Sequence, residues 1–262
     1  MKKILTAMAL FLAAAMPALG QTADELALKA SEMAYYQGKD GKSGVSLVVT
    51  DARGRTRRRD MTILRYDIQD NGEQKYYVYF HKPSDVKGTA YVVWKHAGKD
   101  DDRWLYLPAL DLIRRVAASD KRSSFVGTTF TYEDISGRSP DRDHHELLEA
   151  EGDFHVLKNT PKDAGQVEFA SYKVWVDKNT FIPMKAEYYD ASGKAYRLIE
   201  VLEVEDIQGH KTIVKMKATD RNSGSSTIAD FKDVVYDIGL KADIFTERYL
   251  RNPPRQWIKE GP

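Results

Sequence analysis

The segment "RWLYLPALDLIRRV" (Arg103–Val116) decides how the fold of this 262-residue chain is interpreted. It begins with the alternation of a strand, reaches Pro108, and then repeats its apolar residues every three or four positions, which is the spacing of a helix. These residues are Leu110, Leu112, Ile113 and Val116. The segment therefore predicts a strand that ends at the proline, followed by a helix over residues 108–118. This helix either belongs to a packed core or covers an apolar cavity as a lid, and the spacing alone allows both.

Strand patterns surround this segment on both sides. Runs rich in aromatic and β-branched residues precede and follow it, which is typical of strands. They include "VSLVVTD", "QKYYVYFHKP" and "TAYVVWKHA" before it, and "EFASYKVWVDK", "AYRLIEVLEVE" and "STIADFKDVVYD" after it. Turn sequences such as "DARGR", "DKNT" and "RNSGSS" separate the runs at hairpin spacing, which indicates an antiparallel meander.

The predicted fold class is mainly β with helices (α+β). Because a long antiparallel sheet curls, we expect an unclosed β half-barrel with an N-terminal helix and an inserted helical lid or plug. The N-terminal helix is predicted over residues 22–37, where Thr22 and Glu25 have the spacing of a capping box.

Residues 1–20 have the composition of a signal peptide. Lys2 and Lys3 precede the apolar run "ILTAMALFLAAAM", and small residues end the segment, a pattern that predicts export and cleavage after Gly20. The expected organisation is therefore a signal peptide over 1–20 and a single domain over 21–262, located in the periplasm.

Composition excludes several classes of site. The chain contains no cysteine, so disulfides, thiol catalysis and cysteine metal centres are excluded. Its formal net charge is +1, whereas a nucleic-acid-binding domain is usually strongly basic. We expect no nucleic-acid partner, no metal and no cofactor.

Three stretches resemble a known family. They are "WLYLPALDLIRRVAASDKRSSFVGTTFTYED" (Trp104–Asp134), "WVDKNTFIPMKAEYYDASGK" (Trp175–Lys194) and "DIFTERYL" (Asp243–Leu250). The first resembles a strand, proline, arginine-rich helix and "F-x-G-x-x-F-x-Y-E-D" run of the LolA-like outer-membrane lipoprotein-sorting proteins, within the LolA/LolB lipoprotein-carrier superfamily. The second resembles the family's "D-x-x-T-x-x-P" hairpin, and the third its C-terminal "F-T-x-R-Y-L".

The resemblance implies a carrier without catalysis. It implies an unclosed barrel whose apolar cavity accepts acyl chains of lipid or lipoprotein for transfer toward the outer membrane. The partners that it implies are an inner-membrane lipid exporter and an outer-membrane acceptor, with transient membrane contact.

If the chain is such a carrier, we expect its lipid-binding residues to lie in the strand, in the predicted lid helix and in the aromatic loop that follows. They are Trp94, Leu105, Leu107, Leu110, Ile113, Val116, Phe125 and Phe130. Arg114 and Arg115 are expected to gate the lid or to meet an anionic head group, and the alternative is a solvated pair. The aromatic residues serve equally well as core anchors.

Two other functions stay open at this point. Scattered carboxylates allow an envelope hydrolase, since catalytic pairs need not be adjacent in sequence, although "HELLE" (His145–Glu149) lacks the second histidine of a zinc-protease motif. A filled barrel would instead suit a non-carrier assembly or scaffold protein.

A further motif is the basic run "RTRRRD", in which alternation places Arg55, Arg57 and Arg59 on one face of a strand. This stripe suits contact with anionic phospholipid. The alternative is pairing with acidic residues on neighbouring strands.

Overall fold

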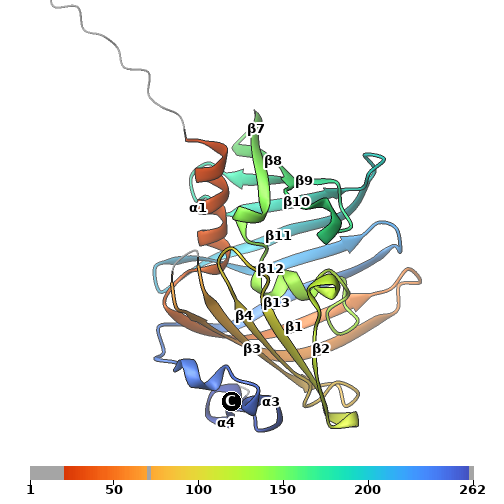
Figure 1. The fold of residues 1–262 in the computed structure, drawn as a ribbon, viewed down its shortest axis with the longest axis vertical. Coiled ribbons are helices and arrows are strands. Elements are labelled where there is room, and N and C mark those ends of the chain that lie inside the picture. The colour runs from red at the N-terminus through yellow and green to blue at the C-terminus, as the bar shows by residue number, and fades with distance from the viewer. Residues whose placement is uncertain (1–20, 70–71, 260–262) are drawn as a thin grey trace, which may run out of the picture.

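The computed structural model describes residues 21–69 and 72–259, so the predicted signal peptide lies outside the described residues (Figure 1). The described strands form one antiparallel sheet in the order β6-β5-β4-β3-β2-β1-β13-β12-β11-β10-β9-β8-β7. The strands are β1 (Asp40–Thr50), β2 (Thr56–Asp67), β3 (Gln74–Lys82), β4 (Ala90–Lys95), β5 (Asp102–Leu107), β6 (Leu112–Arg115), β7 (Asp143–Glu151), β8 (Phe154–Pro161), β9 (Ser171–Asp177), β10 (Pro183–Tyr189), β11 (Ala195–Ile207), β12 (His210–Asp220) and β13 (Ser225–Tyr236). The helices are α1 (Ala23–Tyr35), α2 (Tyr132–Ser136), α3 (Arg248–Arg251) and α4 (Arg255–Ile258).

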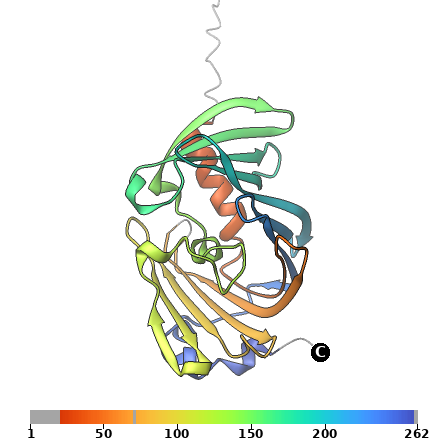
Figure 2. The same cartoon turned by 90° about the vertical axis from the view of Figure 1, so that its right-hand side faces the viewer.

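The sheet consists of two meanders joined through their first and last strands. β1 pairs with β13 in antiparallel register, with Val45 opposite Phe231 and Val49 opposite Thr227. The strands at the two ends of the order are β6 and β7, so the sheet curls without closing. Figure 2 shows this curve with α1 on its concave side. The predicted fold class, an unclosed antiparallel half-barrel with an N-terminal helix, is confirmed.

Helix α1 is fixed at both ends. Thr22 and Glu25 form the predicted capping box, with the Thr22 side chain accepting a hydrogen bond from the Glu25 backbone. At the other end, the Arg65 guanidinium donates to the carbonyls of Tyr35, at 2.9 Å, and Gly38, at 3.0 Å. A cation at the last carbonyls of a helix also stabilises its dipole. None of the helices within the described ranges is long and apolar enough to cross a membrane.

The predicted helix over residues 108–118 is wrong. Only Pro108–Leu110 is helical, as one 3-10 turn, and Asp111 then takes a left-handed conformation with φ 45°. This residue reverses the chain, so Leu112–Arg115 becomes strand β6 and pairs with β5. The short apolar run satisfies helical and strand spacing alike, and the backbone hydrogen bonds of the hairpin decide for the strand.

The inserted element begins after this hairpin. We call residues 116–142 the plug segment. It contains the single-turn helices Ala118–Asp120 and Pro140–Arg142 as well as α2. Figure 2 places it inside the curve of the sheet, beside α1. A plug is therefore present, but it follows the predicted one in sequence and is mostly irregular.

The sheet carries an apolar core on each of its two faces. The concave core contains Val45, Met61 and Phe125, and the plug segment contributes to it. The convex core covers β2 to β5, where Tyr77 and Val92 pack against the C-terminal segment that includes Phe245. Because the C-terminal segment covers the convex face, the concave face is the one available to enclose a ligand.

Candidate functional site: an apolar cavity with a charged wall

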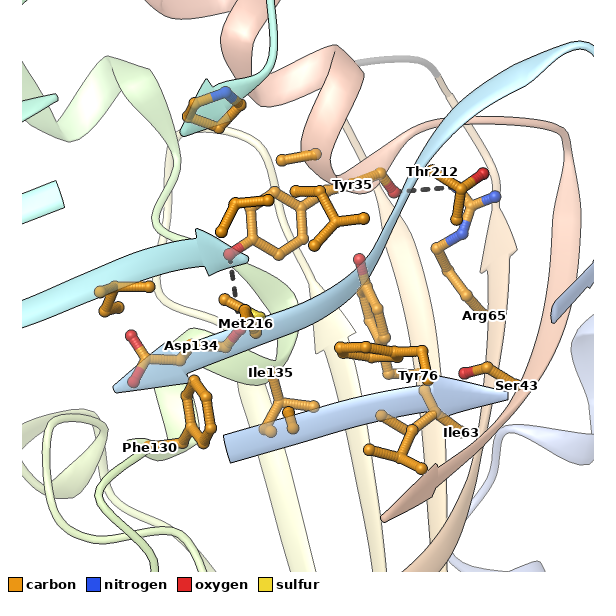
Figure 3. Close-up of a pocket in the computed structure, with 18 of the residues that line it drawn as sticks. Tyr35, Ser43, Ile63, Arg65, Tyr76, Phe130, Asp134, Ile135, Thr212 and Met216 are labelled. Atoms are coloured by element: carbon orange, nitrogen blue, oxygen red, sulfur yellow. Dashed lines mark hydrogen bonds between the residues drawn. The ribbon is translucent and has the colours of Figure 1, made fainter. Parts of the chain in front are cut away.

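A cavity of about 330 Å³ lies between the concave face of the sheet, α1 and the plug segment. Most of its lining is apolar and comes from strands that are far apart in sequence. Representative lining residues are Val45, Met61, Ile63, Ile199, Met216 and Phe231. Figure 3 shows Ile63, Met216, Phe130 and Ile135 around this space. An apolar space of this size is unusual, because protein interiors are normally filled to crystal-like density.

The plug segment closes one side of the cavity with two aromatic rings. Phe125 stacks edge-on against Tyr132, with ring centroids 5.4 Å apart, and Phe130 is buried beside it. The loop between them is attached to the sheet. The backbone N–H of Thr129 donates to Oγ1 of Thr227, and Oγ1 of Thr129 donates to the carbonyl of Ala218, both at 3.0 Å.

Buried ion pairs, most of them within the plug segment, form a charged wall of the cavity. Arg197 of β11 donates to the Asp134 carboxylate, and Arg122 lies 3.9 Å from the same carboxylate. Glu133 pairs with Arg122 and with Arg138, each at 3.3 Å. These side chains are nearly enclosed, and such charges are tolerated inside a protein only when they are paired.

Asp134 is the centre of this network. Burial alone would raise the pKa of its carboxyl group, but Arg197 and Arg122 outweigh burial and hold the pKa below its ordinary value. The same carboxylate accepts a hydrogen bond from the Thr131 backbone at 2.6 Å, which caps α2. The Tyr35 hydroxyl donates to the Asp134 carbonyl at 3.5 Å, so α1 also contacts this point (Figure 3).

A buried lysine supports the other end of α2. Nζ of Lys95 donates to the carbonyl of Ser136 at 2.8 Å and lies over the rings of Tyr35 and Tyr36. Burial is the main cause that lowers the pKa of Lys95 to about 8, although Asp101 opposes the shift.

We predict that Lys95 makes stability rise with pH. Between pH 8 and about 10.4, the unfolded lysine stays protonated while the folded one has lost its proton, so the unfolded chain binds more protons and folding gains. The free energy of unfolding should therefore increase by about 2 kcal/mol more in the wild type than in Lys95→Met between pH 8 and 10. Urea titrations at both pH values measure this difference, and parallel pH dependence in the two proteins would contradict it.

The structure separates the predicted site residues. Phe125 and Phe130 line the cavity. Leu105 and Val116 are buried in the concave core, and Leu107 packs against that core, but these three are not among the residues that line the cavity.

The remaining predicted residues lie elsewhere. Trp94 and Ile113 pack in the convex core, because alternation along β4 and β6 turns them away from the cavity. Leu110 is 70% exposed at the tip of the β5–β6 hairpin. Arg114 and Arg115 are exposed on β6, where Arg115 pairs with Asp102.

Sequence reasoning missed the charged wall and most of the lining. Asp134 and Arg197 are 63 positions apart, and no local pattern connects them. The signal that existed was the "Y-E-D" run after Phe130, which contains Glu133 and Asp134.

The histidine-rich segment near residue 145 has a structural role. His145 contacts Asn159 at 2.6 Å and the carbonyl of Pro140 at 2.9 Å. Within residues 21–69 and 72–259, no group of three histidine, cysteine, aspartate or glutamate side chains is placed to hold a metal ion.

Known proteins share this fold over nearly the whole described chain. A family model described as that of an uncharacterized-protein-like family matches residues 72–252, more than half of the chain. A DUF1329 family protein from Desulfovibrio piger is 26% identical with a TM-score of 0.80, covering 87% of this chain and 97% of that one. A putative outer membrane lipoprotein-sorting protein domain from Vibrio parahaemolyticus has the same identity and TM-score, covering 87% and 98%.

A more distant structure agrees in fold. A LolA superfamily protein from Nitrosomonas europaea is 23% identical with a TM-score of 0.69, covering 87% of this chain and 99% of that one. No curated protein matches the sequence.

Proposed function

We propose that this chain, which belongs to the LolA-like family, is a carrier of acyl chains. Its proposed cargo is a lipid or a lipoprotein. The observation that supports this proposal is the 330 Å³ apolar cavity between the sheet, α1 and the plug segment. Burial of each methylene group gains about 0.8 kcal/mol. A chain of about sixteen carbons therefore gains roughly 12 kcal/mol, enough to require a carrier for passage through water.

The chemistry of the wall favours binding over hydrolysis. A hydrolase would need a carboxylate or histidine whose reactive atoms face the substrate. Glu133 and Asp134, the acidic residues that line the cavity, are instead held by Arg122, Arg138 and Arg197. A filled scaffold is disfavoured by the cavity itself.

The location and route form part of the same proposal. The chain would be exported, cleaved after Gly20, and act in the periplasm as one domain over residues 21–262. It would receive cargo from an inner-membrane exporter and deliver it to an outer-membrane acceptor. The support is the signal-like pattern of residues 1–20 and the lipoprotein-sorting relative from Vibrio parahaemolyticus.

Native mass spectrometry with lipid extraction tests this function on protein purified from the periplasm of its own host. We expect an acylated species to copurify in about equimolar amount and to be replaced by added labelled lipid. An apo mass, together with failure of every added acyl lipid to bind, would contradict the carrier. Release of cleaved lipid would indicate the hydrolase instead.

A further inference from the structure

A second, polar cleft of about 400 Å³ lies against the apolar cavity. Phe130 and Arg122 line both spaces, so the cleft and the cavity border each other at these two side chains. The other lining groups are mainly hydroxyl and guanidinium groups. They include those of Arg57, Ser124, Thr131, Tyr196, Arg197 and Ser225.

Arg59 lies beside this cleft, and Asp85, whose negative charge acts on it, forms no ion pair with it. Its side chain lies on the same face of β2 as Arg57, which lines the cleft. Only 7% of Arg59 is exposed, and its Nε and Nη1 are enclosed with no hydrogen-bond partner. A Cβ on Gly127, another lining residue, would lie 3.4 Å from Nη2 of Arg59. Among the described residues, no carboxylate forms an ion pair with Arg59.

Arg197 also has unused hydrogen-bonding capacity at the cleft. It is 5% exposed, and its Nη2 donates to Asp134 and to the carbonyl of Thr129, whereas Nη1 has no partner. Two enclosed guanidinium groups with unpartnered nitrogens next to one cleft are costly unless an anion is present.

The carboxylates of the cleft are already engaged. Asp51 accepts from Arg55 at 2.7 Å, and Asp220 accepts from the backbone of Asn222 at 2.8 Å. Glu168 accepts from Arg122 and from the Tyr196 hydroxyl, each at 2.9 Å. None of these acidic groups forms an ion pair with Arg59, so the unpartnered guanidinium nitrogens at the cleft favour binding of an anion.

We propose that this cleft binds the phosphate of a phospholipid head group whose acyl chain lies in the adjacent cavity. Guanidinium groups match phosphate with two parallel charged hydrogen bonds, and the surrounding hydroxyl groups can donate to its remaining oxygens. The inference rests on the proposed carrier function and narrows its cargo to lipids with an anionic phosphate. A neutral diacylglycerol with the same chains would leave Arg59 and Arg197 unpartnered.

Chain-matched ligands test the inference. Equilibrium binding of fluorescent phosphatidylglycerol and fluorescent diacylglycerol, with identical acyl chains, separates the head group from the chain. Because a hydrogen bond to a charged group contributes about 1.5–3 kcal/mol, we expect phosphatidylglycerol to bind about tenfold more tightly or better. Arg59→Gln should remove that preference and leave the affinity for diacylglycerol unchanged.

The matched control is Arg58→Gln, which changes an exposed arginine of the same run that pairs with Asp60 and lies on the opposite face of β2 from Arg57 and Arg59. It should keep the preference. Thermal unfolding of Arg59→Gln should show no loss of stability, since the substitution removes an unpaired buried charge. If that variant does not fold, Arg59→Met provides the same test.

The outcomes separate the two proposals. Equal affinities for the two lipids in the wild type would overturn the phosphate site and leave the carrier intact. Failure of both lipids to bind would overturn the carrier. Binding of inorganic phosphate that depends on Arg59, without a preference for phosphatidylglycerol, would identify a free-anion site and overturn the head-group assignment.

Discussion

Replacing Asp134 with alanine is expected to lower the free energy of unfolding by about 3–5 kcal/mol, because removal of one partner leaves buried charge uncompensated. The carboxylate is paired with Arg197 and Arg122 and accepts the capping hydrogen bond of α2 from Thr131. Its loss would leave the nearly enclosed guanidinium of Arg197 without its ion-pair partner, whereas Arg122 would keep Glu133 and Glu168. It would also remove the side-chain cap at the start of α2.

Urea denaturation at pH 7 measures this effect, and hydrogen exchange over the plug segment shows whether it opens first. The control is Glu146→Ala, which breaks an exposed pair with Lys158. That change should cost at most about 1 kcal/mol. A loss below 1 kcal/mol for Asp134→Ala would show that the ion pairs do not hold the plug segment.

The same carboxylate should make the wild type sensitive to acid. The folded pKa of Asp134 lies below its value of about 4 in the unfolded chain. Its stabilising contribution is therefore complete above about pH 4 and is lost as the pH falls through the folded pKa. Asp134→Ala should show a shallower loss of stability than the wild type between pH 5 and 2, measured as urea midpoints.

The sheet was predictable because its signals are local. Turn sequences at regular spacing define hairpins, and consecutive hairpins in one chain form a meander. The capping box of Thr22 and Glu25 is local in the same sense, and it was predicted correctly. The hairpin at Asp111 was not predicted, because the four-residue strand after it has too few positions to distinguish two periods.

The site was less predictable because it depends on which face of the sheet is concave. Alternation assigns Leu105 and Trp104 to opposite faces, but only the path of the C-terminal segment decides that Trp104 lies on the covered, convex face. The charged wall adds a second difficulty. Its partners come from the plug segment and from β11, so pairing emerges only in the folded chain.

Replacing Ala186 with tryptophan is expected to weaken acyl-chain binding by about a hundredfold. Ala186 lies on β10, opposite Val174 and Ile199 in the neighbouring strands, and all three line the cavity. An indole at this position would occupy space that the chain needs. Displacement of about four methylene groups costs roughly 3 kcal/mol, which corresponds to a hundredfold loss.

The fold should tolerate this substitution, because Ala186 is only partly buried and its side chain borders free volume. Fluorescence titration with a labelled phosphatidylglycerol measures the loss, and circular dichroism checks the sheet. The control is Leu110→Trp at the exposed hairpin tip, which should bind as the wild type does. If Leu110→Trp lost binding and Ala186→Trp did not, the ligand would lie at the hairpin as the sequence first suggested, and the cavity would not be the acyl site.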